Sequence, residues 1–138
     1  MRDAVLPNNN DGWWDHGPAE DHDDHLLVAD QNGTVVAYLL GEFVGTNDFA
    51  VIMEVAVVPK WQGRGAGVAL THAFAEIAVR RGCPVIYVRP LRDPERYERL
   101  VAYYARLGFQ SEVEDPEDME GDSRTVEAMS RAVLGGQP

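Results

Sequence analysis

A glycine-rich turn between an apolar run and a helical pattern constrains the fold of this chain most. The apolar run is rich in β-branched residues and ends at Pro59, and glycine then occupies every second position, at Gly63, Gly65 and Gly67. A glycine at the start of a helix costs about 0.5–1 kcal/mol relative to alanine. The glycines therefore indicate that this turn has a left-handed backbone or that another group approaches its main chain closely. The sequence predicts a strand, a turn and a helix that act as one unit.

The length and composition of the chain are those of one domain. It has 138 residues, of which 45% are hydrophobic, and no run reaches the roughly 18 apolar residues of a membrane span. The first residues lack the apolar block of a secretion signal. The single cysteine, Cys83, excludes an internal disulfide framework and is expected to be a small buried residue rather than a nucleophile. We expect a cytoplasmic protein with no membrane partner, built as a polar, acidic arm (residues 1–24) and one domain (residues 25–138).

The charge distribution gives a further constraint. The net charge of -11 argues against nucleic acid as a partner, because phosphate contacts require a basic surface. Residues 1–25 and 112–127 are strongly acidic, whereas residues 60–106 carry most of the arginines. This pattern suggests two ligands of opposite sign. An ordinary solvated surface with two acidic segments explains it equally well.

Apolar periodicity outlines the remaining elements. Asn32-Gly33 is a strong signal for a tight hairpin between two apolar runs, and Asp93 is expected to cap the second helix. The expected elements, in chain order, are strands over 25–30, 34–45 and 49–58, a helix after the glycines that closes at 80–82, a strand over 85–88, a second helix from 94 to 108, and weaker strands near 109–114 and 125–132. This order predicts an α/β (α+β) fold with a mixed, mostly antiparallel sheet and helices on both faces, and with residues 49–88 as a parallel crossover.

The glycine turn fits an anion site, because a helix N-terminus presents unpaired N–H groups and the positive end of the helix dipole. Three classes of phosphorylated ligand compete. A nucleoside-triphosphate loop requires a Lys-Ser or Lys-Thr pair that does not follow here. A dinucleotide fold requires the spacing Gly-x-Gly-x-x-Gly, and the spacing in this chain is Gly-x-Gly-x-Gly.

The third class rests on two motifs. The segment QGRGAG (62–67) matches the pattern Gln/Arg-x-x-Gly-x-Gly/Ala, and YYARLGF (103–109) follows about 40 residues later. In this order they resemble the GCN5-related N-acetyltransferases, from about residue 26 to the C-terminus. The resemblance implies an acyl-CoA N-acyltransferase-like fold with acetyl-CoA, or another acyl-CoA, as co-substrate. Its implied cofactor-binding residues are Val57 and Val58 for the pantetheine arm and Gln62, Gly63, Arg64, Gly65, Ala66 and Gly67 for the pyrophosphate. A turn that serves only helix–sheet packing is the alternative.

The resemblance also implies two catalytic residues. Tyr104 aligns with the family tyrosine that protonates or stabilises the CoA sulfur. Tyr103 is the neighbouring candidate for this role. Alternatively, Tyr104 is part of the apolar core and has no catalytic role. Glu54 is the candidate base. Strand alternation would place it on one face with Ile52, Ala56 and Val58, where a mid-strand carboxylate is costly unless it meets a cation, water or substrate. The competing explanations are an ion pair with a nearby arginine and an edge-exposed side chain. A main-chain N–H near Val57 is the expected oxyanion donor.

The N-terminal part departs from the family pattern. Only about 24 polar residues precede Leu26, too few for the strand and two helices that the family usually has there. The acceptor site is then open, rebuilt by the segment that holds Trp13 and Trp14, or completed by a second subunit in a homodimer. Asp93 and Pro94 stand where the family often has a cofactor-binding asparagine. The run DHDDH (21–25) is expected to be a solvated acidic loop rather than a metal site.

These observations combine into one hypothesis. We expect an N-acetyltransferase in which a primary amine attacks acetyl-CoA directly, without a metal. The acidic segments favour a cationic acceptor such as a polyamine, an aminoglycoside-like amine, a lysine or a peptide N-terminus. The alternative is a regulatory protein that binds acyl-CoA and has lost its acceptor pocket.

Overall fold

The structure, a computed structural model, describes residues 2–6, 22–91, 93–112 and 118–136. In these parts of the chain, seven strands form one sheet in the order β1-β2-β3-β4-β5-β7-β6. Only β4 and β5 pair in parallel, and every other neighbouring pair is antiparallel. The mixed, mostly antiparallel sheet is confirmed. The strands are β1 (Arg2–Leu6), β2 (His22–Gln31), β3 (Thr34–Val44), β4 (Phe49–Val57), β5 (Val85–Val88), β6 (Gln110–Ser111) and β7 (Met119–Asp122).

Local turn chemistry sets the first half of the sheet. Asn32 and Gly33 both adopt positive φ, 54° and 88°, as a two-residue hairpin with primed turn geometry requires. They join β2 to β3 as predicted, and a second turn at residues 45–48 leads into β4. These short connections bring the three strands into one antiparallel meander. The long β4 strand therefore lies in the middle of the sheet.

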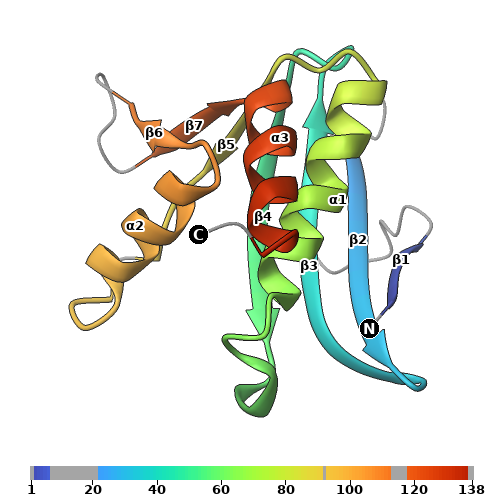
Figure 1. The fold of residues 1–138 in the computed structure, drawn as a ribbon. Helices are drawn as coiled ribbons and strands as arrows, with labels where there is room; N and C mark the ends of the chain where they lie inside the picture. The colour runs from blue at the N-terminus through green and yellow to red at the C-terminus, as the bar shows by residue number, and fades with distance from the viewer. Residues whose placement is uncertain (1, 7–21, 92, 113–117, 137–138) are drawn as a thin grey trace.

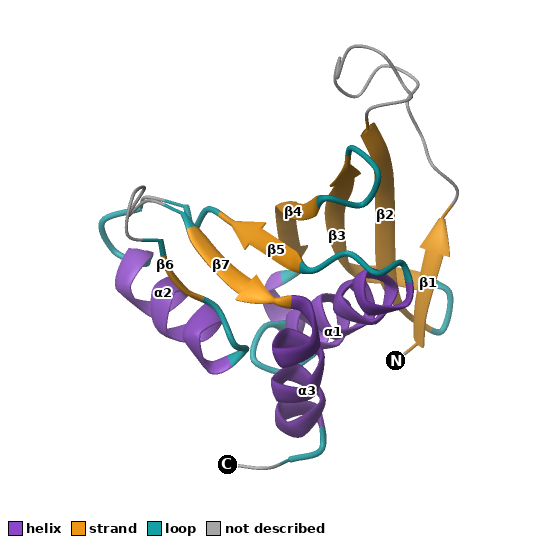
Figure 2. Cartoon of the chain, turned by 90° about the horizontal axis from the view of Figure 1, so that it is seen from above, coloured by secondary structure: helices purple, strands orange, loops and turns teal. Residues whose placement is uncertain are grey.

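Three helices cover one side of this sheet. They are α1 (Ala66–Arg80), α2 (Tyr97–Arg106) and α3 (Ser123–Leu134). Figure 1 shows α1 in front of β2 and β3 with α3 alongside it, and Figure 2 shows all three helices on the same side of the strands. We had expected helices on both faces. No described helix covers the opposite face, because each crossover from β4 through α1 and from β5 through α2 returns on the same side.

The core lies between the sheet and α1. Leu27, Leu39 and Phe43 point from the strands towards Leu70 and Phe74 of the helix, and all five are almost completely buried. The Phe43 and Phe74 rings are 5.1 Å apart between centroids. At about 25 cal/mol per Å² of apolar surface, such side chains supply most of the driving force for this layer. The cluster fixes α1, and with it the glycine turn, against the middle of the sheet.

The structure corrects several element predictions. Residues 2–6 form β1, which pairs with β2, although we had expected residues 1–24 to be a loop or a partly ordered arm; the boundary between arm and domain stays a prediction. Helix α2 begins at Tyr97 rather than at Pro94, because Asp93 caps a preceding turn: its carboxylate accepts from the Glu95 N–H at 3.0 Å. The acidic segment 112–127 contains a strand, β7, which pairs with β5 and β6.

The strand predicted over 125–132 is wrong, because these residues belong to α3. The Asp122 side chain accepts hydrogen bonds from the Thr125 N–H at 3.1 Å and its hydroxyl at 3.2 Å, which starts a helix. Val126 and Ser130 then lie one turn apart and are fully buried, and Val133 packs against the core from the next turn. The helical period of the apolar side chains outweighs their β-branched character.

Candidate functional site

The strands β4 and β5 separate part of the way along their length. They pair only from Ala50 opposite Ile86 to Ile52 opposite Val88, whereas β4 continues to Val57. A register shift against β3 lies at the same point: Leu40 pairs with Glu54 and Gly41 with Ile52, so Met53 is an extra residue in β4. Such a bulge bends the strand and increases its twist. Beyond it, the β5 side of β4 has no strand partner among the described residues.

A cavity of about 430 Å³ opens where the two strands separate. Its walls come from β4, the segment after β5 and helix α2. Glu54 and Tyr104 both line it, and Gln62 of the glycine turn lines its far end. The structure therefore brings both candidate catalytic residues and the candidate phosphate loop to one cavity, although they are up to 50 residues apart in the chain.

The glycine turn has the geometry that its sequence predicted. Gly63 and Gly65 adopt φ of 78° and 88°, the left-handed region that favours glycine, and a side chain at either would meet open space. Gly67 has a different reason: a Cβ atom there would lie 2.8 Å from the Tyr103 hydroxyl of α2. The helix begins at Ala66 without a side-chain cap, so the first-turn N–H groups are open to an anion.

The flanking residues hold the turn in place. The Gln62 amide donates to the carbonyl of Val57 at 3.2 Å and ties the turn to the end of β4. The Val58 N–H donates to the carbonyl of Val36 at 2.9 Å. The Arg64 guanidinium lies 4.9 Å from the centre of the Trp61 ring system, which is half-buried and packs against the core. A ligand that pairs with the Val57 carbonyl would have to displace Gln62, so main-chain binding at Val57 and Val58 stays a prediction.

Tyr104 is the one buried residue of α2, with 7% of its surface exposed. Its ring meets the Tyr103 and Phe109 rings edge-on, at 5.0 and 5.6 Å between centroids. Burial, with a smaller contribution from Tyr103, raises the pKa of the Tyr104 phenol above its ordinary value. The phenol therefore keeps its proton at neutral pH.

Glu54 lies on the face of the sheet that the described helices leave uncovered. Its carboxylate accepts a hydrogen bond of 2.8 Å from the Tyr38 hydroxyl of β3, which raises the pKa of Tyr38. Ala56 and Tyr38 are paired, so both flank Glu54 on this face. The expected grouping with Ile52 is wrong: the extra residue at Met53 turns Ile52 to the helix side, where it is 3% exposed in the core.

A second cavity of about 520 Å³ lies next to the first, along the shared residues Ile52, Met53, Val88 and Arg89. Phe49 and Tyr87 line it with their rings edge-to-face, 5.6 Å apart between centroids. Glu112 and Asp118 line it as well. Burial raises the pKa of Tyr87, and the charges of Glu120, Glu112 and Asp118 raise it further. Tyr87 therefore lies near negatively charged groups.

Sequence reasoning missed several residues of these cavities. Tyr38, the partner of Glu54, is 16 residues away in the chain, and only the antiparallel pairing of β3 with β4 brings them together. Arg89 donates to Asp118 at 2.6 Å between the two cavities. The alternation of Phe49, Val51 and Met53 along the strand could have indicated Phe49. The segment with Trp13 and Trp14 lies outside the described residues.

Two other sequence features have structural roles. The run 21–25 is strand from His22 onwards, not loop, and Asp23 forms an ion pair with Arg81 at 2.6 Å. His25 contacts the same guanidinium at 3.0 Å. Cys83 is 2% exposed, its thiol donates to the carbonyl of Val85, and burial raises its pKa, so its prediction as a small buried residue is confirmed.

Comparisons with known proteins match both the motifs and the fold. The model of the "Acetyltransferase (GNAT) family" matches residues 3–109. A curated protein named acetyltransferase, from Yersinia pestis (strain Pestoides F), is 29% identical over 92 residues, which are 66% of this chain and 62% of that protein. The match thus spans less than two thirds of this relative.

Solved structures show the same fold at low identity. The PaiA N-acetyltransferase of Thermoplasma acidophilum, in complex with coenzyme A, has a TM-score of 0.62 at 18% identity, over 74% of this chain and 61% of that one. A KacTA–DNA complex has a TM-score of 0.61 at 16% identity, over 93% and 98%. None of the helices in the described part of the chain has the length and hydropathy needed to span a bilayer.

Proposed function

Since the chain belongs to the GNAT family of acetyltransferases, whose model matches residues 3–109, we propose that it is an N-acetyltransferase that moves the acetyl group of acetyl-CoA to a primary amine. The observation that carries the proposal is the cavity at the separation of β4 from β5, which Glu54, Tyr104 and Gln62 line together. The family uses acetyl-CoA as co-substrate, and an N-acetyltransferase of this fold has been crystallised with coenzyme A.

The two ends of acetyl-CoA bind near two helices, with the pyrophosphate at the start of α1 and the thioester beside α2. The pyrophosphate lies on the open amides between Gln62 and Gly67, with Arg64 and Lys60 as neighbouring cations. The pantetheine arm enters the cavity and pairs with the edge of β4 that β5 leaves uncovered, displacing the Gln62 amide from the Val57 carbonyl, in the manner of an added strand. The thioester then lies between Tyr104, the proposed acid, and Glu54, the proposed base.

The reaction is a direct attack. The neutral amine forms a C–N bond to the thioester carbonyl, and a main-chain N–H of β4 near Val57 stabilises the oxyanion. Glu54 takes the amine proton, directly or through a water, while its hydrogen bond to Tyr38 orients the carboxylate. The C–S bond breaks, and the Tyr104 phenol donates to the departing thiolate. The products are the acetylated amine and coenzyme A.

The acceptor is a cationic amine that enters by the second cavity. Phe49 and Tyr87 offer aromatic faces there, and Glu112 and Asp118 offer carboxylates, balanced in part by Arg89. Aromatic rings and carboxylates together attract ammonium groups. The net charge of -11 supports an amine rather than nucleic acid as acceptor. A second copy of the chain is one way to complete the acceptor side, and sedimentation analysis tests for this dimer.

Release of free thiol from acetyl-CoA across a panel of amines tests the function. The panel contains a polyamine, an aminoglycoside, a lysine peptide, a peptide with a free N-terminus and a neutral primary amine. We expect turnover with at least one cationic member. Calorimetric binding of coenzyme A without turnover on any amine would instead support the acyl-CoA-binding regulatory protein. Absence of heat with coenzyme A would overturn both.

A further inference from the structure

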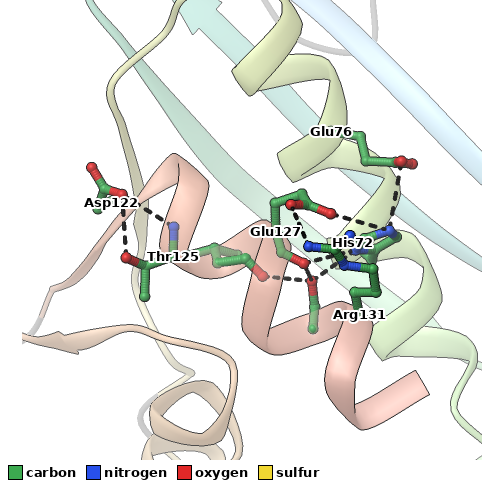
Figure 3. Close-up of polar contacts among 8 residues, drawn as sticks. His72, Glu76, Asp122, Thr125, Glu127 and Arg131 are labelled. Carbon is green, nitrogen blue, oxygen red and sulfur yellow. Dashed lines mark hydrogen bonds and ion pairs between the residues drawn. The ribbon is translucent and has the colours of Figure 1, made fainter. Parts of the chain in front are cut away.

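A cluster of three ligand-type side chains joins α1 to α3, away from both cavities. His72 and Glu76 are one turn apart on α1, and Glu127 faces them from α3 (Figure 3). One ligand atom of each lies within 4.8 Å of the other two. The side chains of His72 and Glu127 are only 15% and 21% exposed, so two of the three are largely withdrawn from water.

The hydrogen bonds around His72 decide which ring nitrogen carries the proton. The Ser130 hydroxyl has one proton, which it donates to the carbonyl of Val126 at 2.5 Å. Ser130 Oγ therefore accepts from His72 Nδ1–H at 3.0 Å, and the carbonyl of Glu127, 3.2 Å from Nδ1, can only accept as well. In the neutral ring, the lone pair is consequently on Nε2.

This lone pair faces two carboxylates. Nε2 is 3.7 Å from Glu76 Oε2 and 3.9 Å from Glu127 Oε2, too far for hydrogen bonds. Arg131 donates to the other oxygen of Glu127, Oε1, at 3.3 Å and so leaves Oε2 turned towards the histidine. When the ring is neutral, three electron-pair donors converge with no proton between them, an arrangement that a bound cation would stabilise.

We propose that His72, Glu76 and Glu127 bind a divalent transition-metal ion of the zinc class. One imidazole nitrogen and two carboxylate oxygens give three protein ligands, and water takes the fourth position. The bond from Nδ1–H to a backbone carbonyl and a hydroxyl is the outer contact that metal-binding histidines usually make. Imidazole disfavours Mg²⁺ and Ca²⁺, which prefer oxygen ligands alone.

The ion has a structural role. It would add a link between two helices that side-chain packing and the hydrogen bonds of His72 already hold together, and it lies away from the cavity of Glu54 and Tyr104. Bound metal would hold α3 against α1 and thereby stabilise the folded state by mass action. The alternative is a metal-free imidazolium that forms ion pairs with both carboxylates.

Zinc titration of the 138-residue chain, after treatment with EDTA and dialysis, distinguishes the two arrangements. We expect one equivalent of Zn²⁺ to bind by calorimetry and to raise the melting temperature, whereas Mg²⁺ does neither. Co²⁺ in the same site should give visible absorption typical of a low-coordinate nitrogen–oxygen environment. Glu76→Gln, at the most exposed ligand, and His72→Gln should each weaken zinc binding by at least about tenfold.

Matched variants serve as controls. Glu98→Gln, an exposed carboxylate on α2, should leave zinc binding unchanged, and so should His22→Gln and His25→Gln in the N-terminal strand. The proposal is overturned if the chain binds no zinc at micromolar concentrations, if His72→Gln and Glu76→Gln bind as tightly as the parent chain, or if binding depends on His22 or His25. Because the readout is metal affinity, the outcome is independent of acetyl transfer.

Discussion

Tyr104 and Glu54 reach one cavity from different elements, a helix and a bulged strand, and each has a distinct environment. The phenol is buried among aromatic rings, whereas the carboxylate is exposed and bonded to Tyr38. A protonated acid and an accessible base at opposite ends of a reacting centre are what amide formation from a thioester requires.

Replacement of Tyr104 by phenylalanine tests its proposed role directly. The ring and its packing are kept while the proton donor is lost, so we expect kcat to fall by about 10²-fold or more, with little change in the affinity for coenzyme A. Steady-state kinetics and calorimetry measure the two quantities. Tyr97→Phe on the same helix is the matched control, and an unchanged kcat in Tyr104→Phe would remove this residue from the mechanism.

The same burial predicts how stability depends on alkaline pH. Burial raises the pKa of Tyr103 to about 12 and that of Tyr104 above its ordinary value. Both keep their protons in the folded state after the unfolded chain has lost them. The free energy of unfolding should thus be unaffected below pH 10 and then fall by about 1.4 kcal/mol per pH unit per tyrosine. Urea denaturation of the parent chain and of Tyr104→Phe measures this, and equal slopes for the two would contradict it.

At the scale of elements, the contact between α1 and β3 depends on the glycine at position 41, which has no side chain. A Cβ atom at Gly41 would lie 2.6 Å from the buried Phe74 ring. Gly41→Ala should therefore cost about 1–3 kcal/mol of unfolding free energy. In a Phe74→Leu background the same change should cost less, because the smaller side chain leaves room. Additive losses in urea denaturation would show that the two residues do not interact.

The start of α3 gives a second element-scale prediction. Asp122→Ala removes the acceptor for both Thr125 donors and should lower the free energy of unfolding by about 1 kcal/mol. Asp122→Asn retains a capping oxygen, so its cost should be only a few tenths of a kcal/mol. Thermal and urea unfolding of the two variants provide the comparison, and equal losses would argue against the cap.

Most elements could be predicted from the sequence because their signals are local. Asn32-Gly33 set the hairpin, and the glycines and apolar spacing set α1. Predictions failed where distant contacts decide the outcome. The helix over 123–134 depends on burial against α1, and the orientation of Ile52 depends on a bulge that only the β3 register reveals. The candidate site followed from its motifs, but Tyr38, Tyr87 and Arg89 did not.

For the molecule as a whole, the distribution of charge separates the two proposed ligands. The donor meets the basic middle of the chain, and the acceptor meets Glu112 and Asp118. All three described helices lie on one side of the sheet, which leaves Glu54 accessible from the other (Figure 2). In the proposed binding mode, opposite charge would draw each ligand to its own part of the surface.

Salt dependence measures this separation. A diamine keeps one positive charge after its attacking amine has lost its proton. Salt screens the attraction between this charge and the carboxylates. We therefore expect kcat/KM for a diamine to fall several-fold between low salt and about 0.5 M NaCl. A neutral primary amine is the control, with little change expected. Equal salt responses for the two acceptors would contradict the cationic-acceptor proposal.

The close approach of Gly67 to the Tyr103 hydroxyl has a consequence for donor selection. It fixes the first turn of α1 directly against α2, the helix that carries Tyr104. The distance between the turn that is proposed to bind the diphosphate and the phenol of Tyr104 is then set by the protein and does not adjust to the ligand. Such a chain would select acyl donors by the length of the linker between phosphate and sulfur, ahead of the acyl group itself. A coenzyme A analogue with one methylene fewer in that linker would occupy the turn and still leave its thioester out of reach.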